Sequence, residues 1–143
     1  MNVVKRLINL GIRGQTDPVY NKHIRFSNSV ALIVCFFIFQ NAVLSIYYKQ
    51  SIILLINCIH IFLIALMPVF NYQGKRVFAS AWFSSVAIVF VTIYSIAFTL
   101  DSYNFVFLPM IIFLQFFLFS ASEKKYIILF TAITLVCFIG AIL

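Results

Sequence analysis

Long runs of apolar residues, separated by short polar segments, follow one another along the chain from Phe26 to Leu143. A membrane-crossing helix needs about 20 mainly apolar residues, because each residue adds about 1.5 Å along the helix axis. Five runs have roughly this length. They predict an all-α, polytopic transmembrane helix bundle with membrane helices over residues 26–48, 51–70, 77–99, 104–121 and 126–143.

The first 25 residues follow another pattern. Apolar residues in 3–12 recur at helical spacing, with basic and amide side chains between them. This pattern predicts a short amphipathic helix lying in the membrane interface, with its basic residues facing anionic headgroups. Gly11 and Gly14 are expected to end it. Residues 1–25 thus form a cytoplasmic juxtamembrane segment, and residues 26–143 form the bundle.

A second helix start precedes the first apolar run. Asp17 suits the N-cap position, and Pro18 suits the first helical position, where its missing N–H costs nothing. The first membrane helix is therefore expected to extend back to about Pro18, with a basic extension on the cytoplasmic side.

Basic residues gather in alternate connections between the apolar runs. Residues 1–25, 71–76 and 121–125 contain nine of the ten Lys and Arg residues, and Lys49 is the exception. Because cytoplasmic loops of membrane proteins are enriched in Lys and Arg, this alternation predicts a cytoplasmic N-terminus. Tyrosines near the ends of the runs agree with these boundaries. We expect a multi-pass protein of the cell (inner) membrane.

Composition excludes several classes of protein. Of 143 residues, 64% are hydrophobic and only 9% are charged, which is too few to cover a water-facing surface. The net charge of +7 is explained by loop topology, and no nucleic-acid-binding motif accompanies it. Three cysteines, at positions 35, 58 and 137, stand alone, so neither a disulfide framework nor a metal site is predicted. No cofactor is expected.

Motifs of catalysis are missing from the sequence. It contains no HExxH, no GxSxG and no paired aspartates within a span. We therefore expect no enzyme. No acidic residue lies within any predicted span, and no inverted repeat is visible. These two observations disfavour a carrier without excluding transport.

Polar side chains within the predicted spans are candidate ligand-binding residues, because amide and ionisable groups are costly in a bilayer. They come from the first, second and fourth helices: Gln40, Asn41, Asn57, His60 and Gln115. Together they predict a small polar cleft that opens outward. The alternative is that they form ordinary hydrogen bonds between helices.

Small and hydroxylated residues form a stripe along the third predicted helix. They are Ala81, Ser84, Ser85, Thr92, Ser95 and Thr99. Such residues allow helix backbones to approach closely, so the stripe predicts a helix-packing surface. A ligand-binding surface is the alternative interpretation.

Four segments carry a resemblance to a known class of proteins. They are KRLINLGIRG (5–14), RFSNSVALI (25–33), NYQGKR (71–76) and SEKK (122–125). With the hydropathy pattern, they resemble the N-terminal six-helix sensor module of bacterial signalling proteins. Such modules precede a histidine kinase, a nucleotide cyclase or a DNA-binding regulator. The resemblance implies a homodimer or other homo-oligomer that detects a hydrophobic or membrane-derived signal.

The chain departs from this class in having five predicted spans and no cytoplasmic output domain. We expect it to continue past Leu143 into a sixth helix; if it is complete, it is a small stand-alone membrane protein. The predicted function is a non-catalytic membrane sensor, receptor or anchor domain in signal transduction. The alternative is a small oligomeric channel, transporter or pore-forming effector.

Overall fold

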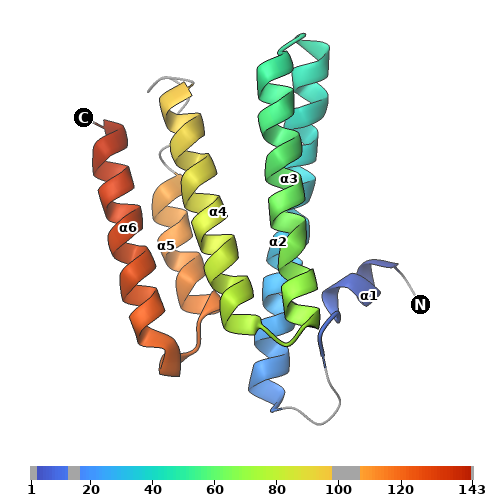
Figure 1. The fold of residues 1–143 in the computed structure, drawn as a ribbon, viewed down its shortest axis with the longest axis vertical. Coiled ribbons are helices and arrows are strands. Elements are labelled where there is room, and N and C mark those ends of the chain that lie inside the picture. The colour runs from blue at the N-terminus through green and yellow to red at the C-terminus, as the bar shows by residue number, and fades with distance from the viewer. Residues whose placement is uncertain (1–2, 13–16, 98–106, 143) are drawn as a thin grey trace. The chain divides into compact units, whose positions relative to one another are not determined.

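The computed structural model describes residues 3–12, 17–97 and 107–142, and these are helical with short turns and no β-strand (Figure 1). The all-α prediction is confirmed. In chain order the elements are α1 (Val3–Ile8), α2 (Pro18–Tyr47), α3 (Ser51–Tyr72), α4 (Arg76–Ala97), α5 (Phe107–Leu118), the short 3-10 helix η3 (Ala121–Glu123) and α6 (Lys124–Ile142).

The helix boundaries lie close to the predicted ones. Three helices, α2, α3 and α4, are long and apolar enough to cross a membrane, and α5 is a shorter apolar helix. The end of α5 at Leu118 comes three residues before the predicted end, because Ser120 already caps the following turn. The predicted start of the fourth span, at 104–106, lies outside the described residues, as does Gly14.

Two compact units make up the chain, Met1–Ala79 and Ser80–Leu143. The first contains α1, the antiparallel hairpin of α2 and α3, and the first turn of α4. The second contains the remainder of α4, with α5, η3 and α6.

The start of α2 confirms the predicted cap. Asp17 is the N-cap, and one of its carboxylate oxygens accepts a hydrogen bond from the Val19 N–H at 2.9 Å. Pro18 occupies the first helical position. Since these two residues satisfy or remove N–H groups that a helix start leaves free, α2 begins here and runs without interruption through residue 25.

A tight turn joins α2 to α3. Lys49 has a positive φ of 56°, and its N–H donates to the Ile46 carbonyl at 3.1 Å. The Gln50 N–H donates to the Ser45 carbonyl at 2.8 Å. These bonds use carbonyls that the end of α2 would otherwise leave free, and the left-handed residue reverses the chain within three positions. The hairpin is therefore closed by its own backbone.

Between α3 and α4 the chain turns at Gly74, whose φ is 79°. The Gly74 N–H donates to the Asn71 carbonyl, and the Lys75 N–H donates to the Phe70 carbonyl, each at 3.0 Å. Glycine adopts this left-handed conformation without the steric cost that a Cβ atom would add. The turn leads directly into α4 at Arg76.

In the second unit, η3 reverses the chain between α5 and α6. Ser120 and Glu123 form a capping box, in which the Ser120 N–H donates to Glu123 Oε2 at 2.8 Å. The Phe119 ring stacks on the rings of Tyr126 and Phe130, with centroid distances of 5.7 and 5.8 Å. These aromatic contacts tie the end of α5 to the first turns of α6.

Candidate functional site

The end of α1 is bonded to the hairpin by one buried amide. Asn28 of α2 points its Nδ2 group at the carbonyl oxygens of Leu7, Ile8 and Leu10, at 3.3, 3.1 and 2.9 Å. A helix end leaves up to four carbonyls without partners inside the helix. Asn28 supplies donors for three acceptors there, so a side chain from another helix caps α1.

Asn28 is in turn bonded to α3. Asn71 Nδ2 donates to Asn28 Oδ1 at 2.7 Å and to Ser27 Oγ at 2.9 Å. The Ser27 hydroxyl donates to the Ile24 carbonyl at 3.0 Å. Asn28 and Asn71 are fully buried, and Ser27 is 1% exposed. We call Ser27, Asn28 and Asn71 the amide junction; it connects α1, α2 and α3.

One acceptor of the amide junction is unused within the described part of the chain. Asn71 Oδ1 is buried and accepts no hydrogen bond there. Leaving a buried polar atom without a partner costs about 1–3 kcal/mol. The amide junction therefore keeps one acceptor without a donor among the described residues.

Gly11 lies directly against the amide junction. Its φ is 90°, and a Cβ atom placed on it would lie 2.6 Å from the Asn71 carbonyl carbon and 2.9 Å from the Tyr72 nitrogen. Both the conformation and the space require glycine at this position. The turn after α1 consequently packs against the backbone at the end of α3.

A second set of contacts lies at the same end of the first unit. The Arg76 guanidinium lies 5.6 Å from the centre of the Tyr20 ring, and the Tyr20 hydroxyl donates to the Gly74 carbonyl at 3.5 Å. Cation–π contacts of this type contribute about 0.5–2 kcal/mol, more when water is excluded. Arg76 is only 6% exposed. These contacts tie the first turn of α2 to the α3–α4 turn.

Near the opposite end of the hairpin, the predicted site residue Asn57 is buried and bonds to α2. Its Nδ2 donates to Ser45 Oγ at 3.3 Å, and Ser45 donates to the Asn41 carbonyl at 2.8 Å. His60, one turn farther along α3, is 5% exposed. The side chains of Gln40 and Asn41 are exposed. Asn57 thus has the interhelical bond that was the alternative to ligand binding.

Gln115, the remaining predicted site residue, bonds across the second unit. Its Nε2 donates to Thr134 Oγ1 at 3.3 Å, and its Oε1 accepts from Thr131 Oγ1 at 3.0 Å. Thr134 also donates to the Phe130 carbonyl. Gln115 is fully buried. Since Gln115 and Asn57 belong to different units, their shared cleft stays a prediction.

The predicted stripe on α4 is mixed in its exposure. Ser84 and Ser95 are buried, Ala81 and Thr92 are half-buried, and Ser85 is exposed; Thr99 lies outside the described residues. The hydroxyls of Ser85, Thr92 and Ser95 donate to carbonyls one turn earlier in α4, at 2.8 to 3.0 Å. A hydrogen bond from α4 to α5 comes from Ser80 instead, whose hydroxyl donates to the Leu118 carbonyl at 3.1 Å.

Sequence reasoning missed the amide junction and Ser80. Asn28 and Asn71 lie near predicted span ends, where water can solvate an amide at little free-energy cost. An amide at such a position therefore does not indicate a site. One available signal was the polar run of residues 27–29, two positions after Arg25. No group of three or more metal-ligating side chains occurs among the described residues.

Comparisons with known protein families, with curated proteins and with solved structures give no match to this chain.

Proposed function

We propose that the chain is a multi-pass α-helical membrane protein with five membrane helices. One observation carries this proposal: two amides in the middle of helices are buried, whereas many large apolar side chains are exposed. Asn57 and Gln115 are 1% and 0% exposed, whereas Phe37 and Phe113 are 59% and 69% exposed. Lipid solvates exposed phenylalanines, and buried amides in a bilayer bond to each other or to backbone.

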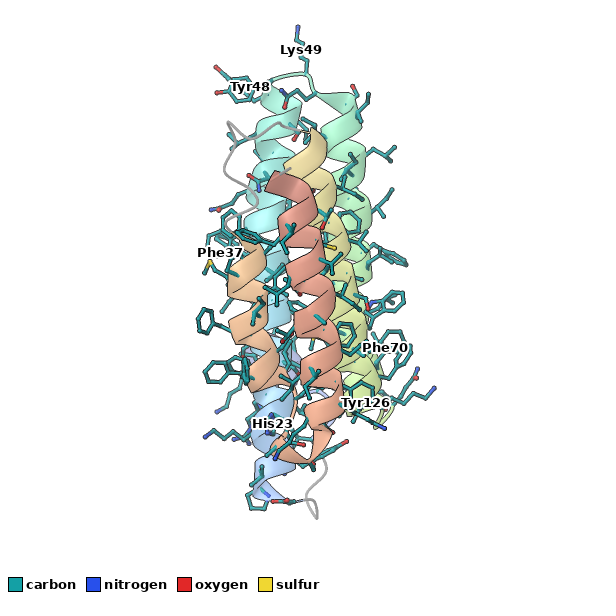
Figure 2. All side chains as sticks on the ribbon, turned by 90° about the vertical axis from the view of Figure 1, so that its left-hand side faces the viewer. His23, Phe37, Tyr48, Lys49, Phe70 and Tyr126 are labelled. Carbon is teal, nitrogen blue, oxygen red and sulfur yellow. The ribbon has the colours of Figure 1, made fainter. Side chains whose placement is uncertain are left out.

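The proposed orientation rests on the two ends of the hairpin. In Figure 2, His23 lies near one end of α2, and Tyr48 and Lys49 lie at the other. The end with His23 also carries Lys22 and Arg25, so by the positive-inside rule it faces the cytoplasm. The bundle then resides in the bacterial inner membrane with its N-terminus inside.

Within that membrane, the proposed role is a non-catalytic sensor or anchor domain. It responds to a hydrophobic or membrane-derived signal by a shift between two helix packings, and it works as a homodimer or other homo-oligomer. Support comes from the amide junction, because a few hydrogen bonds shared by three helices can be redistributed at small net cost. Interhelical hydrogen bonds in membranes average only about 0.6 kcal/mol. A ligand that prefers one packing shifts the population toward it.

A labelling experiment tests the membrane topology. Ser51→Cys and Ser122→Cys are matched substitutions at exposed serines, made in a variant whose three native cysteines are replaced by alanine. With a membrane-impermeant maleimide on intact bacterial spheroplasts, we expect Ser51→Cys to react. Ser122→Cys should react only after the membrane is permeabilised. Labelling of both residues from outside would contradict the five-helix topology.

A reconstitution experiment tests the role. The wild-type protein in lipid vesicles should show no ion or solute flux, while hydrogen exchange of α2 and α3 should depend on lipid composition. Flux above that of empty vesicles would instead support the alternative function, an oligomeric channel or pore. Lipid-independent exchange in α2 and α3 would contradict the sensor role.

A further inference from the structure

α1 presents an apolar face that remains largely exposed. Val3, Val4 and Leu7 are 68%, 53% and 37% exposed. At about 100° per residue these three lie on one side of the helix, and Lys5 and Arg6, both exposed, lie on the other. Such a helix fits the boundary between acyl chains and charged headgroups.

The amide junction fixes the depth at which α1 lies. From residue 29 to the end of α2 at Tyr47 the helix spans about 28 Å, and α3 up to Phe70 spans about 30 Å. Both lengths match the thickness of the hydrocarbon core, about 30 Å. Asn28 and Asn71 therefore lie at the membrane surface, and α1 lies beside them at an angle to the hairpin (Figure 1).

The end of the first unit that carries α1 and the amide junction has a strongly positive net charge. Among the described residues of the first unit, the basic side chains at this end are Lys5, Arg6, Lys22, Arg25, Lys75 and Arg76. Asp17 is the one carboxylate described there, and it caps α2. An excess of this kind is complementary to the negative surface of a cytoplasmic leaflet.

We propose that α1 is a docking surface for the anionic phospholipid headgroups of the surrounding membrane, and that the amide junction passes its occupancy to the α2–α3 hairpin. Lys5 and Arg6 contact the headgroups, and Val3, Val4 and Leu7 enter the acyl boundary. The second half of the proposal rests on the proposed sensor function; the first half requires only that the protein is in a membrane.

The coupling follows from the way Asn28 is shared. Its Nδ2 group binds the carbonyls of α1, and its Oδ1 atom accepts from Asn71 of α3. When α1 leaves the membrane surface and separates from the hairpin, Nδ2 loses its acceptors, and the bond from Asn71 to Oδ1 alone orients the Asn28 amide. Rotation of one amide moves both of its ends, so the Asn28–Asn71 bond between α2 and α3 changes with it.

The test is hydrogen–deuterium exchange of the full chain in lipid vesicles. Vesicles of phosphatidylcholine are compared with equimolar vesicles of phosphatidylcholine and phosphatidylglycerol. One basic residue near an anionic surface strengthens binding about fivefold, so Lys5 and Arg6 together give about 25-fold. We expect exchange of the amides of residues 7–12 to slow by about this factor in the anionic vesicles.

Two variants locate the effect. The double variant Lys5→Gln, Arg6→Gln should lose the lipid dependence. Lys49→Asn is the control, because it removes a basic residue at the opposite end, and asparagine tolerates the positive φ at that position. It should keep the dependence. The helix content of each variant, measured by circular dichroism, reports whether it is folded.

Every outcome decides the proposal. Equal exchange of residues 7–12 in both vesicles overturns lipid docking at α1. Loss of the dependence in a Lys22→Gln, Arg25→Gln variant but not in the Lys5, Arg6 variant places the lipid contact on α2 and also overturns it. If α1 responds as expected while α2 and α3 do not, docking stands and the sensor function fails.

Discussion

Asn28→Ala is the substitution that most directly tests the amide junction. It removes the two amide hydrogens that three carbonyls of the α1 end share, at 2.9 to 3.3 Å, and the oxygen to which Asn71 donates at 2.7 Å. The α2 helix itself should persist, since alanine has the highest helix propensity. The change is therefore expected to act on α1 and on the contact between α2 and α3.

The size of the effect of Asn28→Ala follows from the number of hydrogen bonds that the substitution removes. Two donated bonds and one accepted bond are lost, each contributing about 0.5–1.5 kcal/mol in proteins and about 0.6 kcal/mol between membrane helices. With α1 at the proposed membrane surface, water reaches its vacated carbonyls, so the full penalty for buried unpaired groups does not apply. Only the two donated bonds hold α1, so we expect α1 to detach more easily by about 1–3 kcal/mol, or about 5- to 150-fold.

Hydrogen exchange in vesicles measures this equilibrium. Amides whose bonds depend on the docked segment, such as the Asn9 N–H to the Lys5 carbonyl and the Ile12 N–H to the Asn9 carbonyl, should exchange faster by that factor. Asn41→Ala is the matched control, because it removes an exposed amide from the same helix. If the two alanine variants exchange equally over residues 7–12, the reasoning about Asn28 is refuted.

Two further matched pairs extend the test. Gly11→Ala should release α1 at a cost of about 2–4 kcal/mol, since it combines a clash with a strained positive φ, and hydrogen exchange of residues 7–12 measures it. In Gly140→Ala the new Cβ has no atom within 4 Å, so the variant should be more stable by about 0.5–1 kcal/mol in thermal unfolding. A loss of stability would contradict the open space around Gly140. Gln115→Leu should lower stability in detergent by about 0.6–2 kcal/mol, whereas Gln40→Leu, at an exposed position, should leave it unchanged. Equal melting temperatures for those two would refute a stabilising role for Gln115.

Helix positions were predictable to within a few residues. The start of α3 at Ser51 and the cap of α2 at Asp17 follow from local chemistry: a run of apolar residues of the right length, and a carboxylate placed to accept the first free N–H. Signals of this kind act between residues close in the chain, so no knowledge of the fold is needed to detect them.

The candidate site was predictable only in its residue types. Asn57 and Gln115 stand out because amides are costly inside a membrane, yet their partners, Ser45 and Thr134, are ordinary residues in a sequence. Asn28 and Asn71 attract no attention at the ends of their spans. Their bond joins residues 43 positions apart, and no periodicity or composition indicates such a pairing.

The sequence by itself determines that the chain is helical and apolar, where most helices begin and end, and which loops are basic. These properties depend on hydropathy, capping and charge counted along the chain. Only the tertiary structure decided that Asn28 caps α1, that Asn71 connects this cap to α3, and that Gly11 must lack a side chain. The physical reason is that hydrogen bonds and close packing depend on distances of about 3 Å between atoms far apart in sequence. Those distances exist only once the helices have packed.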